Sequence, residues 1–375
     1  MQKAPPRNLF FSALVTNPYI PHEAIEISPG VKVSGIDGLA DNAGALPGVF
    51  VEISSHRCTA DGGLLIQGSV GRQARDSLAR STHATGCWRV SPEGAVTPAS
   101  VIAYQGSHSK THCDLRSFGR DDPKRWQDAL KRVDVIMQER LVSKKIQSEY
   151  KSSVEDPHGN IWISEACGLH KFSRDGQHEV VIDDDISCSP KRPRRTLMRM
   201  SHLAYDRVAD ELVFATDFYA GAYGGYSGVW RLGKDRQYRE VARWSFSGPP
   251  LLNPKQMLGN GDGPGFMAVD SKGRIWFGMR ESWVAEGPQS NRVYRTLPGA
   301  DKVELVINDI VSRGPNVPGV NRIDYRDGSF KTANINNLFG ASCFDPRDNL
   351  FVAQSTRGMI RKIEQEKARI VTWVH

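Results

Sequence analysis

A polar turn followed by a short apolar run recurs along this chain of 375 residues, and this repeat constrains the fold more than any other feature. The clearest copies are "DPHGNIWISE" from Asp156, "DSKGRIWFGM" from Asp270 and "DPRDNLFVAQ" from Asp345, and looser copies begin at Asp206 and Thr59. Asp with Gly or Asn is typical of a tight turn, and four or five apolar residues are typical of a strand that is buried on both faces. The chain is therefore expected to build one β-unit several times.

A second phrase follows these runs and predicts a hairpin. Most copies show Gly or Asn, an apolar pair, Arg or Lys and a turn, and then another β-prone run such as "HEVVI" or "KVELVI". Six copies begin at Gly86, Gly168, Gly228, Asn291, Asn321 and Gly358. Six outer hairpins with five clear inner strands predict an all-β fold, a six-bladed β-propeller, in which a radial array of small sheets leaves few free edges. The sixth inner strand would lie around "IVSRGPNVPGV".

The repeat separates an N-terminal segment, residues 1–46, from the propeller itself, residues 47–375. The N-terminal part of the chain is expected to supply a strand that closes the propeller, within "VKVSGI" or "GVFVEI". One further segment, about residues 119–148, breaks the repeat and is predicted to be a helical insertion between the first and second blades.

The inserted helix has a clear start and one apolar face. Asp121 or Asp122 can cap it, and Pro123 suits its first turn. Five apolar residues recur at helical spacing on one face: Trp126, Leu130, Val133, Met137 and Leu141. The helix either packs over one end of the propeller or acts as a lid or a partner-docking element.

Composition narrows the possible partners. The net charge of +7 comes in part from the basic cluster Lys191–Arg195, but no base-stacking aromatic motif accompanies it, so nucleic-acid binding is not expected. No apolar run reaches the roughly 18 residues that span a membrane, so no membrane span is expected. The apolar "LFFSALV" near the N-terminus is too short for a convincing signal peptide.

Six cysteines are widely spaced along the chain, at positions 58, 87, 113, 167, 188 and 343. Such spacing in a long chain favours reduced thiols in a cytoplasmic protein. The alternative is two or three disulfides in an exported protein whose native N-terminus has been removed.

The phrase "MAVDSKGRIWFG", Met267 to Gly278, resembles the NHL-repeat and gluconolactonase (strictosidine-synthase-like) six-bladed β-propellers. "SVEDPHGNIWIS" and "SCFDPRDNLFVAQS" match the same template, and the resemblance covers roughly residues 47 to 375 apart from the helix. One such scaffold carries many functions, so the resemblance is informative about architecture and much less so about chemistry.

The lactonase branch implies a divalent metal at the central axis, held by Glu, Asn and Asp side chains in motifs such as Pro-Asp-Gly. At that position this chain reads Pro264-Gly265-Phe266, and Ser201-His202 stands at the position of an Asn-Gly motif. A hard cation needs several oxygen ligands, preferably carboxylates, so no cofactor is expected. Asp262 is the nearby carboxylate that could hold a calcium or zinc ion instead.

Three long connections between strands are candidates for a ligand-binding surface: "SVGRQARDSLARSTHAT", "DFYAGAYGGYSG" and "RESWVAEGPQS". Equivalent positions in different blades lie at the same end of a propeller, so these segments are expected to gather there. Tyrosine offers both an apolar face and a polar tip for recognition. The predicted ligand-binding residues are Tyr223, Tyr226, Arg280, Trp283, Arg72 and Arg75. This surface would suit an anionic small molecule, a glycan or a protein, although the glycines also suit plain tight turns.

Catalytic motifs are scarce. The chain has no G-x-S-x-G elbow and no H-E-x-x-H motif, and no Ser-His-Asp arrangement can be placed. His202 is expected near the axis, where Asp217 or Glu165 could help it act as a general base. The alternative is a structural histidine that is bonded to neighbouring backbone.

A second cluster has residue types that zinc favours: His83, Cys87, His108, His112 and Cys113. Its spacing fits no familiar zinc finger, and two surface loops are the alternative.

Two functions follow from these features. The favoured prediction is a binding protein that recognises a ligand or protein partner through its loop-rich end. The alternative is a lactonase-like hydrolase or a lyase with a rearranged axial site.

Overall fold

The structure of this chain is a computed structural model that describes residues 24–28, 31–34, 49–72, 82–93, 96–105, 113–144, 148–183, 199–217, 226–245, 257–260, 262–280, 289–297, 302–311, 327–333, 335, 340–354 and 359–374. At several strand ends only the backbone is described. The chain divides into two units: Met1–Phe118 with Asp327–Ser329 and Asn337–His375, and Gly119–Arg326 with Phe330–Asn336.

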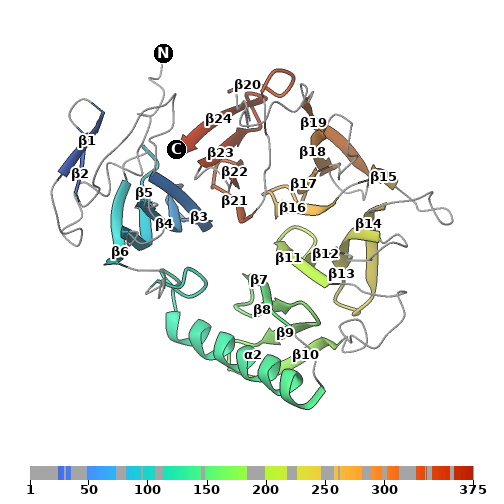
Figure 1. Cartoon of the computed structure of the whole chain (residues 1–375). Coiled ribbons are helices and arrows are strands. Elements are labelled where there is room, and N and C mark those ends of the chain that lie inside the picture. The colour runs from blue at the N-terminus through green and yellow to red at the C-terminus, as the bar shows by residue number, and fades with distance from the viewer. Residues whose placement is uncertain are drawn as a thin grey trace. The chain divides into compact units, whose positions relative to one another are not determined.

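Four consecutive antiparallel strands build each blade, and the described residues form an all-β β-propeller with one helix (Figure 1). The first unit holds one sheet of β3 (Val49–Cys58), β4 (Leu64–Arg72), β5 (Thr82–Val90) and β6 (Val96–Gln105). It holds a second sheet of β21 (Ser342–Phe344), β22 (Asn349–Gln354), β23 (Met359–Glu364) and β24 (Arg369–Val374), with β20 (Gly328–Ser329) on the outer side of β24. A separate two-stranded sheet pairs β1 (Ala24–Ser28) with β2 (Val31–Ser34).

The second unit holds three sheets and the helix α2 (Pro123–Lys144). The first sheet has β7 (Tyr150–Glu155), β8 (Ile161–Glu165), β9 (Gly168–Phe172) and β10 (His178–Asp183). The next has β11 (Arg199–Asp206), β12 (Glu211–Asp217), β13 (Tyr226–Leu232) and β14 (Tyr238–Ser245), with β15 (Met257–Asn260) parallel to β14. The third has β16 (Asp262–Val269), β17 (Ile275–Arg280), β18 (Gln289–Thr296) and β19 (Val303–Val311).

The described residues form five blades, so the prediction of six was wrong. The hairpin expected from Asn321 does not make a sheet of its own, because Gly328 and Ser329 pair with β24 as a fifth strand of the last blade. Residues 321–326 of that hairpin lie outside the described residues.

The N-terminal segment, which was predicted to close the propeller, lies mostly outside the described residues, and that role stays a prediction. Among the described residues, Val31–Ser34 of "VKVSGI" pairs with β1, and Val49–Ile53 of "GVFVEI" belongs to β3, the first strand of the first blade. Each blade takes its four described strands from one continuous stretch of chain. The strand that precedes each repeated turn, such as "YKSSVE" in β7, was not counted in the predicted repeat unit.

The repeated Asp explains why the turn phrase recurs. Asp270 is 5% exposed, and its carboxylate accepts hydrogen bonds from the backbone N–H groups of Lys272 and Arg274 at 3.0 Å each and from Trp276 Nε1 at 3.0 Å. Gly273 completes the turn with a φ of +74°, a conformation that glycine adopts without strain. Asp156 and Asp345 hold their turns in the same way. One carboxylate thus closes the turn and anchors the next strand, and in the first blade Thr59 stands at the equivalent position.

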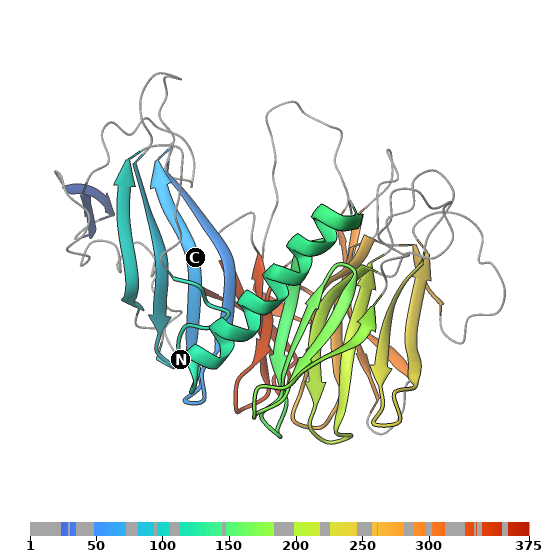
Figure 2. The same ribbon diagram turned by 90° about the horizontal axis from the view of Figure 1, so that it is seen from below.

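Helix α2 packs along the sheet of β7 to β10 (Figures 1 and 2). The Asp122 carboxylate accepts the backbone N–H of Arg125 at 3.0 Å, which confirms the predicted cap. Trp126, Leu130 and Val133 are buried against Ile161, Ile163 and Phe172. The predicted face is wrong at its last position, since Leu141 is 43% exposed and Arg140, at 6%, is buried instead.

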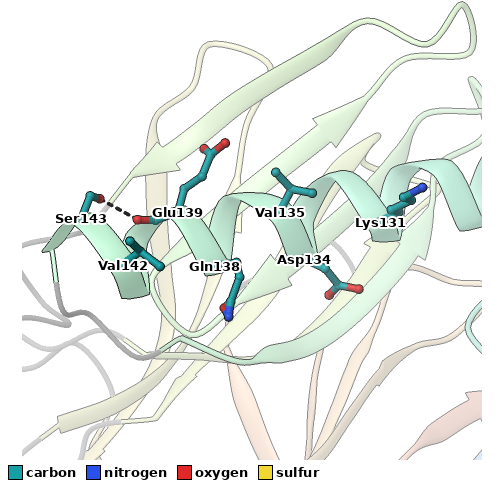
Figure 3. A pocket seen from close by; sticks show the side chains of 7 residues that line it. All are labelled: Lys131, Asp134, Val135, Gln138, Glu139, Val142 and Ser143. Carbon is teal, nitrogen blue, oxygen red and sulfur yellow. Dashed lines mark hydrogen bonds between the residues drawn. The ribbon is translucent and has the colours of Figure 1, made fainter.

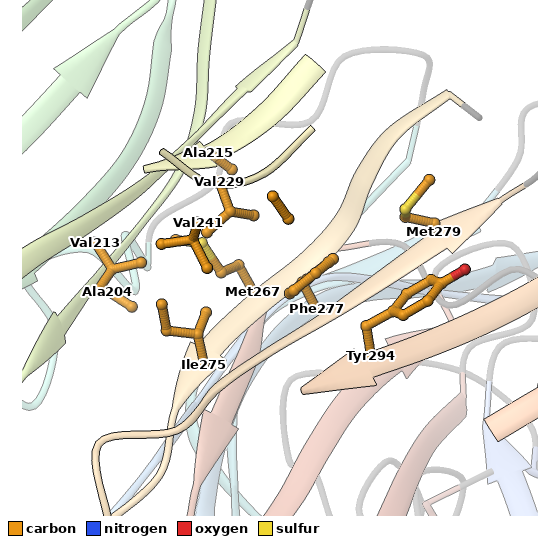
Figure 4. Packing of buried hydrophobic residues seen from close by; sticks show 11 residues of the cluster. Ala204, Val213, Ala215, Val229, Val241, Met267, Ile275, Phe277, Met279 and Tyr294 are labelled. Atoms are coloured by element: carbon orange, nitrogen blue, oxygen red, sulfur yellow. The ribbon is translucent and has the colours of Figure 1, made fainter. Parts of the chain in front are cut away.

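An apolar cluster fills the space between the second and third blades of the second unit (Figure 4). Val213, Ala215 and Val229 on one sheet meet Met267 and Phe277 on the next, and all are at most 3% exposed. Burying a side chain of this kind stabilises the fold by about 1.5–3 kcal/mol. The apolar run after each repeated turn therefore serves the packing between blades, as its sequence predicts.

In the first unit, β3 is joined to the last blade. Cys58 forms a disulfide with Cys343, with Cα atoms 5.6 Å apart, and His56 Nε2 donates to the carbonyl oxygen of Phe351 at 3.2 Å. His56 is 4% exposed, and burial lowers its pKa to about 4, so the ring is neutral at pH 7. The first and last blades of the chain are thus held together by a covalent bond and a buried hydrogen bond.

The expectation of reduced thiols was wrong. Besides Cys58–Cys343, Cys87 on β5 is bonded to Cys113, with Cα atoms 5.8 Å apart, and Cys167 is also disulfide-bonded. These Cα separations lie within the usual range for disulfides. Within the described part of the chain, no helix is long and apolar enough to cross a membrane.

Candidate functional site

His202, the predicted general base, lies on β11 and links two blades of the second unit. Its Nε2 donates to the carbonyl oxygen of Pro264 on β16 at 2.9 Å. Burial lowers the pKa of His202 to about 4, and the positive charge of Lys151 adds to the effect. The imidazole is therefore neutral at pH 7, with one nitrogen committed to backbone. This is the structural role that the sequence left open as the alternative.

Glu165, the second predicted catalytic residue, is fully buried under helix α2. Its carboxylate forms an ion pair with Arg140 and accepts hydrogen bonds from Ser148 Oγ and from the Cys167 N–H, the last at 3.0 Å. Arg140 also donates to Asp183 Oδ1 at 2.7 Å. Glu165 therefore anchors the helix to the blade, and no hydrogen bond or ion pair among the described residues joins it to His202.

A histidine beside this ion pair went unnoticed in the sequence. His170 is fully buried, with Nε2 3.5 Å from Glu165 Oε1 and Nδ1 3.2 Å from His178 Nε2. Burial and the nearby charge of Arg140 lower the pKa of His170 to about 4. The pairing of consecutive strands β8, β9 and β10 brings Glu165, His170 and His178 together, and the packing of α2 adds Arg140.

Asp217 lies on β12, which pairs with the strand of His202, but its own register partner is Arg199. His202 pairs with Ala215, and Asp217 lies two residues further along β12, on the same face of that strand as Ala215. Its side chain lies outside the described residues, so its pairing with His202 stays a prediction.

The register brings together two residues that the sequence assigned to different sites. Asp262, the predicted metal ligand, stands directly opposite Arg280, a predicted ligand-binding residue, on β16 and β17. Opposite charges at such cross-strand positions favour each other. Both side chains lie outside the described residues.

The remaining predicted ligand-binding residues stand at strand ends or beyond them. Arg72 ends β4, and Tyr226 begins β13. Tyr223, Trp283 and Arg75 lie outside the described residues. The backbone confirms that each of the three connections follows the second strand of its blade.

The residues at the positions of the expected metal ligands do not fit a hard cation. Gly265 offers no side chain, and His202 and the Pro264 carbonyl, which flank that position, are bonded to each other. Within the described ranges, no group of three or more His, Cys, Asp or Glu side chains could hold a metal ion. Two of the proposed zinc ligands, Cys87 and Cys113, form a disulfide with each other, which corrects that prediction. His108 and His112 lie outside the described residues.

Two pockets are formed by described residues of the second unit. The larger, of about 650 Å³, runs along the face of α2 that points away from its sheet (Figure 3). Val135 and Val142 line it at 40% and 77% exposure, between Lys131, Gln138 and Glu139. This is the outer face of the helix that was predicted either to pack or to dock a partner.

The smaller pocket, of about 270 Å³, opens between the sheet of β7 to β10 and the sheet of β11 to β15. It lies at the end of the sheets where the short turns are, because the turn residues His158, Asp210 and Lys234 line it. Asp210 binds His158 Nε2 at 3.0 Å and Lys234 Nζ at 2.5 Å, and it accepts the Tyr205 hydroxyl at 2.8 Å. These donors lower the pKa of Asp210, while burial and the same carboxylate raise the pKa of Tyr205.

Comparison with known proteins supports no family assignment. No family model matches the chain, and no curated protein matches it either. Among solved structures, it is similar to a virginiamycin B lyase from Staphylococcus aureus, at 10% identity and a TM-score of 0.36, over 87% of this chain and 88% of that one. It is also similar to a gluconolactonase from Xanthomonas campestris, at 12% identity and a TM-score of 0.30, over 60% and 75% of the two chains. At these values the likeness carries no argument about activity.

Proposed function

We propose that this chain is a binding protein that recognises a small molecule, a glycan or a protein through the long connections at one end of its sheets. The observation that carries the proposal is the engagement of both described catalytic candidates in structural contacts. His202 is neutral and donates a hydrogen bond to the Pro264 carbonyl, and the buried Glu165 forms an ion pair with Arg140. A general base should instead be free to take a proton from a substrate near neutral pH.

Topology supports the choice of end. In each blade concerned, the long connection joins the second strand to the third, while short turns join the first strand to the second and the third to the fourth. In the second unit, residues 218–225 and 281–288 make two such connections on neighbouring blades. They carry Tyr223 and Trp283, the predicted anchors of the surface. Aromatic and arginine side chains are enriched at recognition surfaces.

The disulfides indicate the kind of cellular compartment in which the protein would bind its ligand. Cys58–Cys343, Cys87–Cys113 and the bond of Cys167 would persist in an oxidising compartment and be reduced in the cytoplasm. We therefore propose an oxidising compartment outside the cytoplasm, where glycans and protein surfaces are available as ligands.

A glycan array tests the proposal with a matched pair of variants. The native chain is expected to bind a subset of acidic glycans, and the double variant Tyr223→Ala/Tyr226→Ala should weaken that binding at least about tenfold, since truncating aromatic anchors is costly. Tyr238→Ala is the control, because Tyr238 is 55% exposed and stands at the opposite end of the same hairpin. Its binding should equal that of the native chain.

A panel of lactone-hydrolysis assays, run beside the array, tests the alternative that the protein is an enzyme. Turnover of any lactone that is lost in His202→Gln, with an unchanged Tm, would contradict the binding proposal and support the hydrolase or lyase. Equal glycan binding by the native chain and the Tyr223→Ala/Tyr226→Ala variant would contradict the choice of surface.

A further inference from the structure

We propose that the pocket between the sheet of β7 to β10 and the sheet of β11 to β15 is a second binding site, for a small carboxylate that carries a ring or another compact apolar body. The site lies entirely within the second unit. It is formed at the short-turn end of the sheets, the end opposite to the long connections, and so is separate from the surface proposed above.

The floor of the pocket is apolar. Leu212 and Leu232, at 2% and 5% exposure, belong to the hydrophobic cluster that Val181, Trp162 and Tyr205 flank, and all five line the pocket. Small-molecule sites generally combine such a floor with a few polar groups, and they span roughly 300–1,000 Å³. At about 270 Å³, this pocket suits a ligand below drug size.

The carboxylates of the pocket already have donors. Asp156 is 5% exposed and accepts hydrogen bonds from the His158 and Asn160 N–H groups at 3.0 and 2.8 Å, from Asn160 Nδ2 at 2.7 Å and from Trp162 Nε1 at 2.9 Å. Glu179 forms an ion pair with Arg236 at 2.5 Å. The two oxygens of Asp210 are shared among His158, Lys234 and Tyr205. A cationic ligand would have to displace one of these donors.

Lys171 is different from the other cations that line the pocket. Its ammonium lies 5.3 Å from the centre of the Trp162 ring, and it forms no ion pair with a described carboxylate. Glu179, which stands opposite Lys171 in the register of β9 and β10, is bound to Arg236 instead. Lys234 and Arg236, by contrast, are each bound to an acidic side chain. An anionic group that enters the pocket would therefore meet one available cation beside an aromatic ring and an apolar floor. A hydrogen bond between an ammonium and a carboxylate is stronger than one between two neutral groups.

Calorimetric titration of the full, disulfide-bonded chain with phenylacetate and with its neutral analogue phenylacetamide tests this site. The acid is expected to bind at least about tenfold more tightly than the amide, because one charged contact contributes roughly 1.4 kcal/mol or more. Lys171→Met should abolish that preference and leave weak binding of the amide unchanged. Lys171→Arg keeps the charge and should keep the preference.

Lys131→Met is the matched control. Lys131 is an exposed lysine of α2 in the same unit, without a carboxylate partner among the described residues, and it does not line this pocket. This variant and Tyr223→Ala/Tyr226→Ala should bind phenylacetate like the native chain, which separates this site from the loop surface. Equal affinity for acid and amide, an unchanged preference in Lys171→Met, or no binding at millimolar concentration would each overturn the proposal.

Discussion

Cys58 on β3 and Cys343 on β21 are 285 residues apart in the chain and form a disulfide that joins its first blade to its last. A bond that closes so long a loop removes much of the conformational freedom of the unfolded chain. We expect Cys58→Ala/Cys343→Ala to lower the free energy of unfolding by about 3–5 kcal/mol, measured by urea denaturation. In excess dithiothreitol the native chain loses its disulfides too, so most of the difference from the variant should disappear. A loss below about 1 kcal/mol under oxidising conditions would show that the bond does not constrain the unfolded chain.

All six cysteines are expected to be oxidised in the native protein. Cys58 pairs with Cys343 and Cys87 with Cys113, and Cys167 is also bonded. Cys188 lies outside the described residues, and we expect it to be the partner of Cys167 because no other cysteine remains. Thiol titration in denaturant should find no free thiols, and peptide mapping without reduction should recover three linked pairs. Free thiols in protein secreted from an oxidising host would return the chain to the cytoplasmic interpretation.

The ion pair of Glu165 and Arg140 should matter for stability. Arg140→Met leaves a fully buried carboxylate without its cation, and such a loss costs about 3–5 kcal/mol. Adding Glu165→Gln removes the stranded charge, so the double variant should be more stable than Arg140→Met alone. Lys131→Met on the same helix is the control and should change the free energy of unfolding by less than about 0.5 kcal/mol. Strictly additive losses in the double variant would show that the two side chains are not coupled.

The repeated aspartate should contribute strongly to the stability of the blades that contain it. Asp270→Ala removes the acceptor of two backbone N–H groups, of Arg274 Nε and of Trp276 Nε1, and is expected to destabilise the protein by about 2–4 kcal/mol. Thermal unfolding followed by tryptophan fluorescence would report the loss. Asp235→Ala is the control, since the exposed Asp235 accepts one turn N–H, from Gln237 at 3.1 Å, and should cost at most about 1 kcal/mol. Equal costs at the two positions would refute this account of the repeat.

Acid should weaken the fold through its buried histidines. His56, His170 and His202 have pKa values lowered to about 4 in the folded state, against 6.5 for an ordinary histidine. Between these values the unfolded chain binds more protons, so stability falls as the pH falls from about 6.5 towards 4. Each histidine is expected to contribute a loss of about 2 kcal/mol between pH 7 and pH 5.

The variant His202→Gln isolates one of these contributions, because glutamine can donate to the Pro264 carbonyl without titrating. Urea denaturation at pH 7, 6 and 5 should show a smaller pH dependence for the variant than for the native chain. The same slope in both proteins would mean that His202 titrates normally, and this would restore it as a candidate general base.

Much of the local structure could be predicted from sequence. The Asp turns, the apolar strands after them and the hairpins that follow depend on residues within about ten positions of each other, and the structure confirms them in five blades but not for the hairpin expected from Asn321. Asp122 caps α2 through a hydrogen bond from Arg125, only three residues away, so this cap could be predicted for the same reason. The face of the helix was right until its last turn, where Arg140 takes the buried place because Glu165 lies below it.

Sequence by itself thus determined the β-unit, its repetition and the inserted helix, because these arise from short-range periodicity and turn chemistry. Tertiary structure decided how many units become blades, since Gly328 and Ser329 join an existing sheet through pairing with β24. It also decided which cysteines bond, that His202 serves the Pro264 carbonyl, and that Lys171 faces a pocket between two sheets. Each of these depends on residues that are distant in the chain, and their meeting is set by how the sheets pack.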